Sequence, residues 1–348
     1  MMAITMKALA RTGFLFVGKS AARFTDTTVR ENMLDPKLQA RSLIASEKYF
    51  SDSGYPLRLM TPMMDLASAT EDFGGKVNYP DNASPEVARF AYQAAGGIDN
   101  IPNANFSSES DVGIHVVRML RAHYGTGKPG NERLFANCIL GPFSLAARLA
   151  DETVLLAKTC EDPDQVLRLL VKATNYLIQQ AQTTLDVCGK GTGVIVCEPT
   201  AGMLSGPFAT MYSNTFVKMI MDAVTEKGGL PMYHNCGNSV PAFADTLNDI
   251  GASVIHIGNG TAQNRIFIAN VAPAINSSIW ISGNLDPIHF INKHEKGIFY
   301  QMTLNLLRSM GGSDNFIASC GCDLPFDARP ENMLEFFRAI RDFYRDAA

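Results

Sequence analysis

Short apolar runs recur along the chain, and longer stretches with a helical spacing of apolar residues separate them. Each run is about as long as one strand, and its continuous apolar character is typical of a strand that is buried on both faces. Eight strands are predicted, at residues 13–18, 57–62, 134–140, 193–197, 230–234, 253–257, 278–282 and 315–319.

The stretches between these runs place apolar residues three and four positions apart, which predicts helices. The predicted helix at 164–185 carries its apolar side chains at Val166, Leu169, Leu170, Ala173, Leu177 and Ala181. Further helices are predicted at 207–224 and at 330–344, where Pro330 suits a first helical turn. The alternation favours an α/β fold of the (β/α)8 TIM-barrel type, and a doubly wound open sheet is the alternative.

The chain has a length that fits one such barrel, so we expect a single domain that spans residues 1–348. Within it, residues 73–124 are rich in Asn, Ser, Gly and Pro. We interpret this stretch as an insertion near the barrel mouth. No internal repeat or linker divides the sequence.

Composition narrows the range of partners. The formal net charge of -4 and the isoelectric point near 5.9 provide no basic surface for nucleic acid. No apolar run approaches the roughly 18–20 residues that span a bilayer, so we expect no membrane contact. The 7 cysteines are an odd number without the spacing of a disulfide framework, which favours a reducing, cytoplasmic location.

Candidate chemistry begins with His234 and Cys236, which lie at the end of the run at 230–234. Residues two apart on a strand point to the same face, so the imidazole and the thiol can converge. A second source of thiols, Cys320 and Cys322, follows the run at 315–319. One imidazole and two thiolates suit Zn²⁺ with an open fourth position, as in catalytic sites.

Polar residues follow other predicted strands as well. Active sites of these barrels lie at the C-terminal ends of the strands, so these residues would face one mouth. They are expected to line a site for a small molecule. The residues concerned are Asp65, Glu198, Asn259, Asn284 and Asp286.

Several motifs together resemble one family. His-Asn-Cys-Gly-Asn at 234–238, Gly-Asn-Leu-Asp-Pro at 283–287 and Gly-Cys-Asp at 321–323 resemble motifs of the methylcobamide:coenzyme M methyltransferases. These enzymes are a branch of the uroporphyrinogen decarboxylase superfamily. The stretches 140–146 and 197–201 resemble further landmarks of the superfamily. The resemblance covers residue 134 to the C-terminus, with a looser match at 64–75.

The resemblance implies that His234, Cys236 and Cys322 bind zinc, with Cys320 as the reserve third ligand. Glu198, Asp65 and Asn284 are the candidate catalytic residues, and a helix cap or salt bridge is the alternative for Glu198. Two features of the family are missing from the sequence. The stretch 256–260 lacks the glutamate that closes the resting zinc site in such relatives. The arginine-rich N-terminal motif of true uroporphyrinogen decarboxylases is also absent, which disfavours porphyrinogen decarboxylation.

The function implied is transfer of a methyl group between a methylated corrinoid, carried by a partner protein, and a thiol such as coenzyme M. A zinc-activated thiolate would be the nucleophile. One alternative is a demethylating enzyme that passes a methyl group from a methoxy or methylamine compound to a cobalt(I) corrinoid. Another is a barrel of the same superfamily without methyl transfer, either a decarboxylase or a non-catalytic corrinoid- or metal-binding protein. We expect a monomer or a homodimer, since the superfamily contains both.

Overall fold

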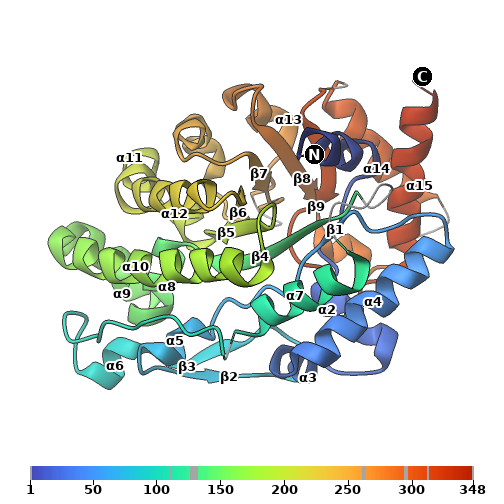
Figure 1. The fold of residues 1–348 in the computed structure, drawn as a ribbon. Coiled ribbons are helices and arrows are strands. Elements are labelled where there is room, and N and C mark those ends of the chain that lie inside the picture. The colour runs from blue at the N-terminus through green and yellow to red at the C-terminus, as the bar shows by residue number, and fades with distance from the viewer. Residues whose placement is uncertain are drawn as a thin grey trace.

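The computed structural model describes residues 2–109, 111–125, 132–260, 264–293, 297–311 and 313–346. Its centre is a curled sheet of seven strands, all parallel, in the order β1-β4-β5-β6-β7-β8-β9 (Figure 1). Helices surround the sheet. The strands are β1 (Leu59–Met60), β4 (Leu134–Leu140), β5 (Gly193–Cys197), β6 (Leu230–Asn235), β7 (Val254–Ile257), β8 (Trp280–Leu285) and β9 (Phe316–Cys320).

The predicted first strand, at residues 13–18, closes the barrel beside β9. It pairs there only through one isolated bridge between Phe14 and Ser319. Little of it remains extended, because Gly13 has a left-handed φ of 65° and Gly18 begins the short helix α2 (Gly18–Ala21). This segment lies between the two edges of the sheet. A Cβ at Gly18 would sit 2.7 Å from Cα of Met63, just after β1. The predicted barrel fold is confirmed, with shorter pairing at residues 13–18 and 57–62 than the sequence indicated.

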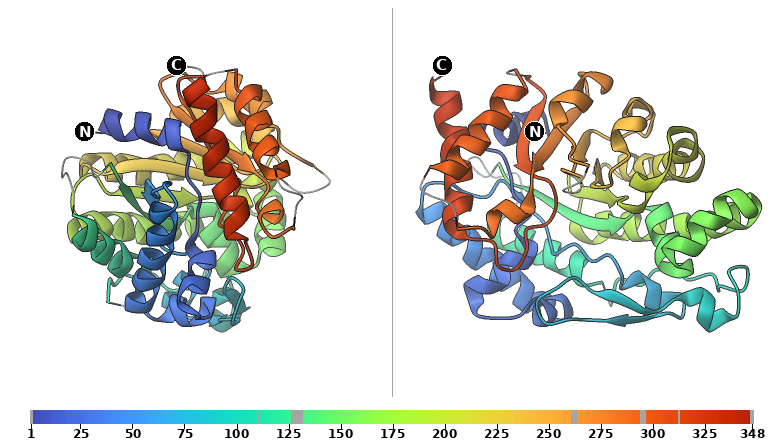
Figure 2. Two further views of the ribbon diagram at one scale, coloured as in Figure 1. Left: turned by 90° about the vertical axis from the view of Figure 1, so that its right-hand side faces the viewer. Right: turned by 180° about the vertical axis from the view of Figure 1, so that it is seen from behind.

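Helices form the outer layer, as the apolar spacing predicted (Figure 2). All six apolar residues listed for the predicted helix at 164–185 are buried on α10 (Pro163–Cys188), and Asp162 caps its first turn. The other long helices are α1 (Met2–Thr12), α4 (Pro36–Asp52), α7 (Val112–Tyr124), α8 (Pro142–Ala150), α9 (Glu152–Glu161), α12 (Thr215–Glu226), α14 (Ile298–Ser309) and α15 (Pro330–Asp346).

The predicted helix at 207–224 is interrupted. It consists of α11 (Gly206–Ala209), a π-helical turn (Thr210–Asn214) and then α12. The remaining short helices are α3 (Val29–Leu34), α5 (Ala69–Asp72), α6 (Ala91–Ala95) and α13 (Ile268–Val271).

The stretch at 73–124 contains an antiparallel hairpin, β2 (Lys76–Asn78) and β3 (Glu86–Arg89), on the side of the molecule away from both chain ends (Figures 1 and 2). Its last part is α7, which packs against α4, α10 and β4 in the helix layer. The stretch therefore combines a surface hairpin with one of the barrel helices. The single domain with its insertion stays a prediction.

Within the described ranges, every helix falls short of the length and apolarity that a bilayer crossing requires. The core lies inside the sheet and between the sheet and its helices. Phe14 and Phe16, from the N-terminal segment, are among its fully buried aromatic residues. They bring this segment against the C-terminal half of the sheet, where the candidate site lies.

Candidate metal centre

The structure brings His234, Cys236 and Cys322 together at the C-terminal ends of β6 and β9. The nitrogen and sulfur atoms that they offer all lie within 4.8 Å of one another, and His234 Nε2 is 3.8 Å from Cys322 Sγ. In tetrahedral zinc sites with Zn–N near 2.0–2.1 Å and Zn–S near 2.3 Å, a nitrogen and a sulfur ligand are about 3.6 Å apart. The donor set and its spacing therefore fit a zinc ion.

A hydrogen bond between the two thiols shifts their pKa values in opposite directions. The hydrogen bond with Cys236 holds the pKa of Cys322 well below the usual range of a thiol. The same hydrogen bond, followed by burial, raises the pKa of Cys236 well above that range. Zinc would displace the remaining thiol proton, because cysteine binds metal as the thiolate.

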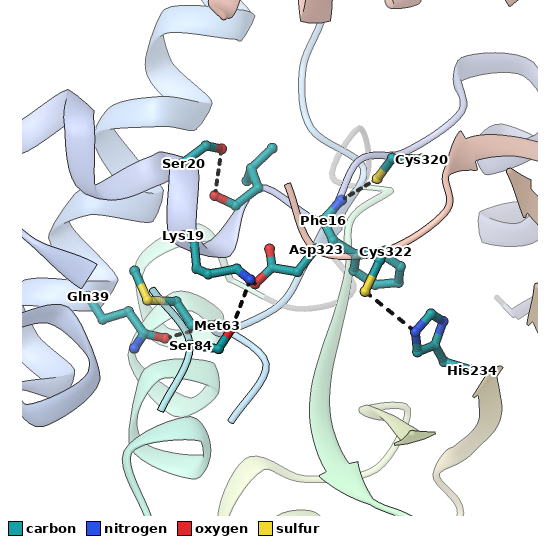
Figure 3. Close-up of polar contacts among 11 residues, drawn as sticks. Phe16, Lys19, Ser20, Gln39, Met63, Ser84, His234, Cys320, Cys322 and Asp323 are labelled. Atoms are coloured by element: carbon teal, nitrogen blue, oxygen red, sulfur yellow. Dashed lines mark hydrogen bonds and ion pairs between the residues drawn. The ribbon is translucent and has the colours of Figure 1, made fainter. Parts of the chain in front are cut away.

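Cys322, rather than Cys320, faces His234 (Figure 3). The Cys320 thiol is fully buried on the other side, where it accepts a hydrogen bond of 3.4 Å from the backbone N–H of Phe16. Burial raises the pKa of Cys320, which disfavours the thiolate that a metal needs. The structure therefore places Cys322 with His234 and gives Cys320 a separate contact, and the role of Cys322 as third ligand stays a prediction.

A glycine between the two cysteines is required by close packing. A Cβ at Gly321 would lie 2.5 Å from Asn259 Oδ1 and 2.9 Å from the Asn259 backbone nitrogen. Asn259 follows β7, so the Cys-Gly-Cys turn after β9 packs against the end of a strand that is two positions away in the sheet. This contact sets the position from which Cys322 reaches the cluster.

His256 is a site residue that the sequence reasoning missed. It lies on β7 directly beside His234 in the strand register, and the two Nδ1 atoms are 2.7 Å apart. His256 Nε2 lies 2.8 Å from the carbonyl oxygen of Cys320 and 2.9 Å from Ser319 Oγ. The sequence could have indicated this pair only through the register of the two strands, which places His234 opposite His256. That register was not known from the sequence.

Lys19 is a second residue that the sequence reasoning missed. Its ammonium donates to Ser84 Oγ at 3.0 Å and lies 3.9 Å from Asp323 Oδ2 (Figure 3). Burial raises the pKa of Asp323 to about 7, and the positive charge of Lys19 opposes that rise. The same charge opposes the rise in the pKa of Cys236 and adds to the fall in the pKa of Cys322. Lys19 thus contributes a positive field at the thiol pair.

Glu198 is fully buried beside the cluster, but its carboxylate faces helix α8. It accepts hydrogen bonds from the backbone N–H groups of Phe143 and Ser144, both at 2.9 Å, and from the hydroxyls of Ser144 and Ser213 at 2.6 and 3.3 Å. Burial raises its pKa to about 7 despite these donors. These are the contacts of a helix cap, the alternative role considered for this residue, and its catalytic role stays a prediction.

Asp65 and Asn284 also lie at strand ends and outside the three-residue cluster. Asp65 Oδ1 accepts from the backbone N–H groups of Ala67 and Ser68, at 3.0 and 2.9 Å. Asn284 Nδ2 donates to the carbonyl oxygens of Gly258 and Ile266, at 3.1 and 2.8 Å. Both side chains stabilise loops at the mouth, and their catalytic roles stay predictions.

Three of the polar strand ends line an outer cavity instead. Arg265 approaches Asp286 to 3.7 Å, and Asp286 caps the short helix that starts at Pro287. Asp286, Asn259 and Asn284 all line a cavity between α13 and α14. The five polar strand ends therefore do not all converge on the thiol cluster.

Comparison with known proteins agrees with this architecture. The chain is 25% identical over 229 residues to the methylcobamide:CoM methyltransferase MtbA of Methanosarcina mazei, and 23% identical over 229 residues to the protein of the same name from Methanosarcina acetivorans. Each alignment covers 64% of this chain and 63% of the relative. A solved structure of a methyltransferase from Methanosarcina mazei superposes with a TM-score of 0.74 at 16% identity, covering 97% of this chain and 98% of that one.

The similarity to the curated relatives thus spans less than two thirds of their length, and the superposition at 16% identity establishes the fold alone. The family pattern described as uroporphyrinogen decarboxylase (URO-D) matches residues 17–343, which is nearly the whole chain. This match includes every strand of the sheet and all three residues of the thiol cluster. The chain therefore belongs to the uroporphyrinogen decarboxylase (URO-D) family.

Proposed function

We propose that this protein is a zinc-dependent methyltransferase that moves a methyl group between a methylated corrinoid and a thiol acceptor. The observation that carries the proposal is the cluster of His234, Cys236 and Cys322, whose ligand atoms lie within 4.8 Å of one another. The relatives named methylcobamide:CoM methyltransferase support the same reaction class. Coenzyme M is one candidate acceptor, and a corrinoid protein is the expected partner.

Zinc bound at this cluster would supply Lewis acidity that favours the thiolate form of an acceptor thiol. A free alkyl thiol has a pKa of about 8.5 and is mostly protonated at neutral pH. The thiolates of Cys236 and Cys322 with the neutral imidazole of His234 balance a dication, so the centre carries no net charge. His234 is only 2% exposed and the two cysteines are partly buried, so little water would reach the ligand atoms of the cluster.

In the transfer itself, the acceptor sulfur forms a bond to the methyl carbon as the bond between carbon and cobalt breaks. Both electrons of the broken bond stay on cobalt, which goes from cobalt(III) to cobalt(I). The residues of the chain position the acceptor so that its sulfur and the methyl carbon are in line. The corrinoid would approach the C-terminal ends of the strands, where the cluster lies.

The test uses the whole protein with zinc and methylcobalamin, and follows cobalt(I) formation in the visible spectrum with a panel of thiols. We expect methyl loss with at least one thiol, and loss of that activity in Cys236→Ser. Cys160→Ser is the matched control, because Cys160 is exposed on α9. A Cys236→Ser protein that keeps both zinc and full thiol methylation would refute the proposal.

One observation favours the demethylating alternative. A cavity of about 250 Å³ beside Cys138 is lined by the carboxylates of Asp65, Glu71 and Asp111. Among the described residues that line it there is no lysine or arginine, so it suits a cationic methylamine donor better than an anionic molecule. The same spectroscopic assay, run with cobalt(I) corrinoid and methylated amines, distinguishes the two directions. Methyl-cobalt formation from an amine, without thiol methylation, would favour the alternative.

A further inference from the structure

His234 and His256 form a buried pair on adjacent parallel strands. Their Nδ1 atoms are 2.7 Å apart, and the two side chains are 2% and 1% exposed. A contact this short between two ring nitrogens requires one of them to carry a proton and the other a lone pair. The proton can therefore be assigned from the other contacts of the two rings.

The proton positions can be assigned from Nε2 of His256, the ring nitrogen that does not contact His234. Its Nε2 lies 2.8 Å from the carbonyl oxygen of Cys320, and a carbonyl oxygen can only accept a hydrogen bond. His256 Nε2 therefore carries a proton, and Ser319 Oγ, 2.9 Å away, serves as a second acceptor. The ring of His256 is 1% exposed, and its hydrogen-bond partners are an imidazole, a hydroxyl and a carbonyl rather than a carboxylate, so a buried charge would go unpaired and the ring is neutral, with a single N–H.

This leaves a lone pair on His256 Nδ1, which accepts from the Nδ1–H of His234. His234 then has no proton on Nε2, and that nitrogen is the one 3.8 Å from Cys322 Sγ. The hydrogen bonds thus run from His234 to His256 to the carbonyl of Cys320. These bonds leave a lone pair on His234 Nε2, the nitrogen that lies near the thiols of Cys236 and Cys322.

We propose that His256 is a positioning residue that holds His234 in the Nδ1–H tautomer, so that Nε2 is ready to bind a metal. The inference rests on the proposed function only in taking His234 as a metal ligand. Zinc-binding histidines commonly donate their second ring N–H to a carboxylate, a carbonyl or water. Here a second imidazole takes that place and passes the interaction on to a backbone carbonyl.

Aromatic packing keeps the pair in this geometry. The ring of Phe16 meets His256 edge to face at 5.0 Å and His234 at 6.1 Å between centroids. Phe14 adds a tilted contact to His256 at 5.8 Å. These rings come from the N-terminal segment, which Leu324 also holds by a backbone hydrogen bond of 2.8 Å to Phe16. Rotation of either imidazole would require this packing to open.

The first experiment measures the tautomer in the metal-free, full-length protein by NMR of its ¹⁵N-labelled histidines. The chain has 6 histidines, and a His234→Gln variant assigns the ring signals of His234 by their loss. We expect a protonated Nδ1 and a bare Nε2 for His234, and the reverse for His256. A proton on His234 Nε2 would overturn the proposal, and no substitution at His256 is needed to see it.

The second experiment measures zinc affinity by competition with a chromophoric chelator. Loss of an outer hydrogen-bond partner of a metal ligand typically costs 10–100-fold in affinity, and we expect a loss of about that size in His256→Phe. His256→Gln should recover much of the affinity, because its amide can accept from His234 and donate to the Cys320 carbonyl. Ser282→Ala is the matched control, since Ser282 hydrogen-bonds Ser319 at 3.0 Å, one step further along the same network.

The outcomes separate this inference from the proposed function. A folded His256→Phe protein that binds zinc as tightly as the wild type, with an unchanged His234 tautomer, overturns the inference even if thiol methylation is observed. The expected tautomer, together with weaker zinc binding in His256→Phe, supports it even if no thiol is methylated.

Discussion

Substitution of Gly321 by alanine tests whether the packing between strand ends sets the metal geometry. The new Cβ would lie 2.5 Å from Asn259 Oδ1, 2.9 Å from the Asn259 backbone nitrogen and 3.3 Å from its Cβ. The side-chain amide could rotate away, but the backbone nitrogen cannot, so the turn that carries Cys322 must move. Ligand atoms of a metal site tolerate displacements of only about 0.2 Å.

The expected magnitude follows from the cost of overpacking, which is typically about 1–3 kcal/mol. If the bound form carries this strain, zinc affinity falls by roughly 5- to 150-fold, since about 1.4 kcal/mol corresponds to a factor of ten. If the metal-free protein carries it, the melting temperature falls by about 2–4 °C per kcal/mol instead, by the scaling for domains of 150–250 residues. Chelator competition and thermal melting of the metal-free protein measure the two quantities.

The control for this substitution is Gly206→Ala. Its added Cβ would lie 3.1 Å from the carbonyl oxygen of Ala242 and 4.0 Å from the next nearest atom, Cβ of Phe243. We expect wild-type zinc affinity in this variant. The reasoning would be refuted by a Gly321→Ala protein with both an unchanged melting temperature and zinc affinity within twofold of the wild type.

Three further predictions concern single residues. Cys322→Ser should lose bound zinc in elemental analysis, whereas Cys320→Ser should retain it; equal zinc content in both would contradict the ligand assignment. Burial raises the pKa of Glu198 from 4.5 to about 7, so its contribution to stability is present below pH 4.5 and is lost as the pH rises through about 7. Melting temperatures across this range should fall less steeply in Glu198→Gln, and an unchanged slope would argue against the shift. Arg133→Ala should lower the free energy of unfolding, measured in urea, by about 3–5 kcal/mol. The substitution leaves the carboxylate of Glu47, which is 6% exposed, without its ion-pair partner. A loss below about 1 kcal/mol would contradict this prediction.

Much of the architecture could be predicted from local pattern. The burial of α10 matches its apolar spacing, and six of the eight predicted strands agree with β4 to β9 within two or three residues. The two N-terminal strands were overestimated, because apolar residues there are buried without pairing over their whole length. Phe16 illustrates this, since it is 1% exposed but its backbone N–H donates to a thiol.

The candidate site could also be predicted only in part. Residue types and spacing were enough to select His234, Cys236 and one thiol from Cys320 or Cys322, because two positions on one strand share a face and the barrel brings strand ends together, and the family resemblance favoured Cys322. The structure brings these three together, and their role as metal ligands stays a prediction. The direction of the Glu198 side chain could not be derived, because it depends on the N-terminus of α8, whose orphan N–H groups attract the carboxylate.

The sequence by itself determined the strand and helix order, the barrel class, the family motifs and the set of three candidate ligands. The family resemblance favoured Cys322 over Cys320, but only the tertiary structure shows the physical reason: Gly321 packs against Asn259, and the Cys320 thiol accepts a hydrogen bond from the backbone N–H of Phe16. It also revealed His256, on β7, and Lys19, on the short helix α2. Periodicity reports which face a residue occupies, but strand register and side-chain packing decide which faces meet, and those depend on contacts between distant parts of the chain.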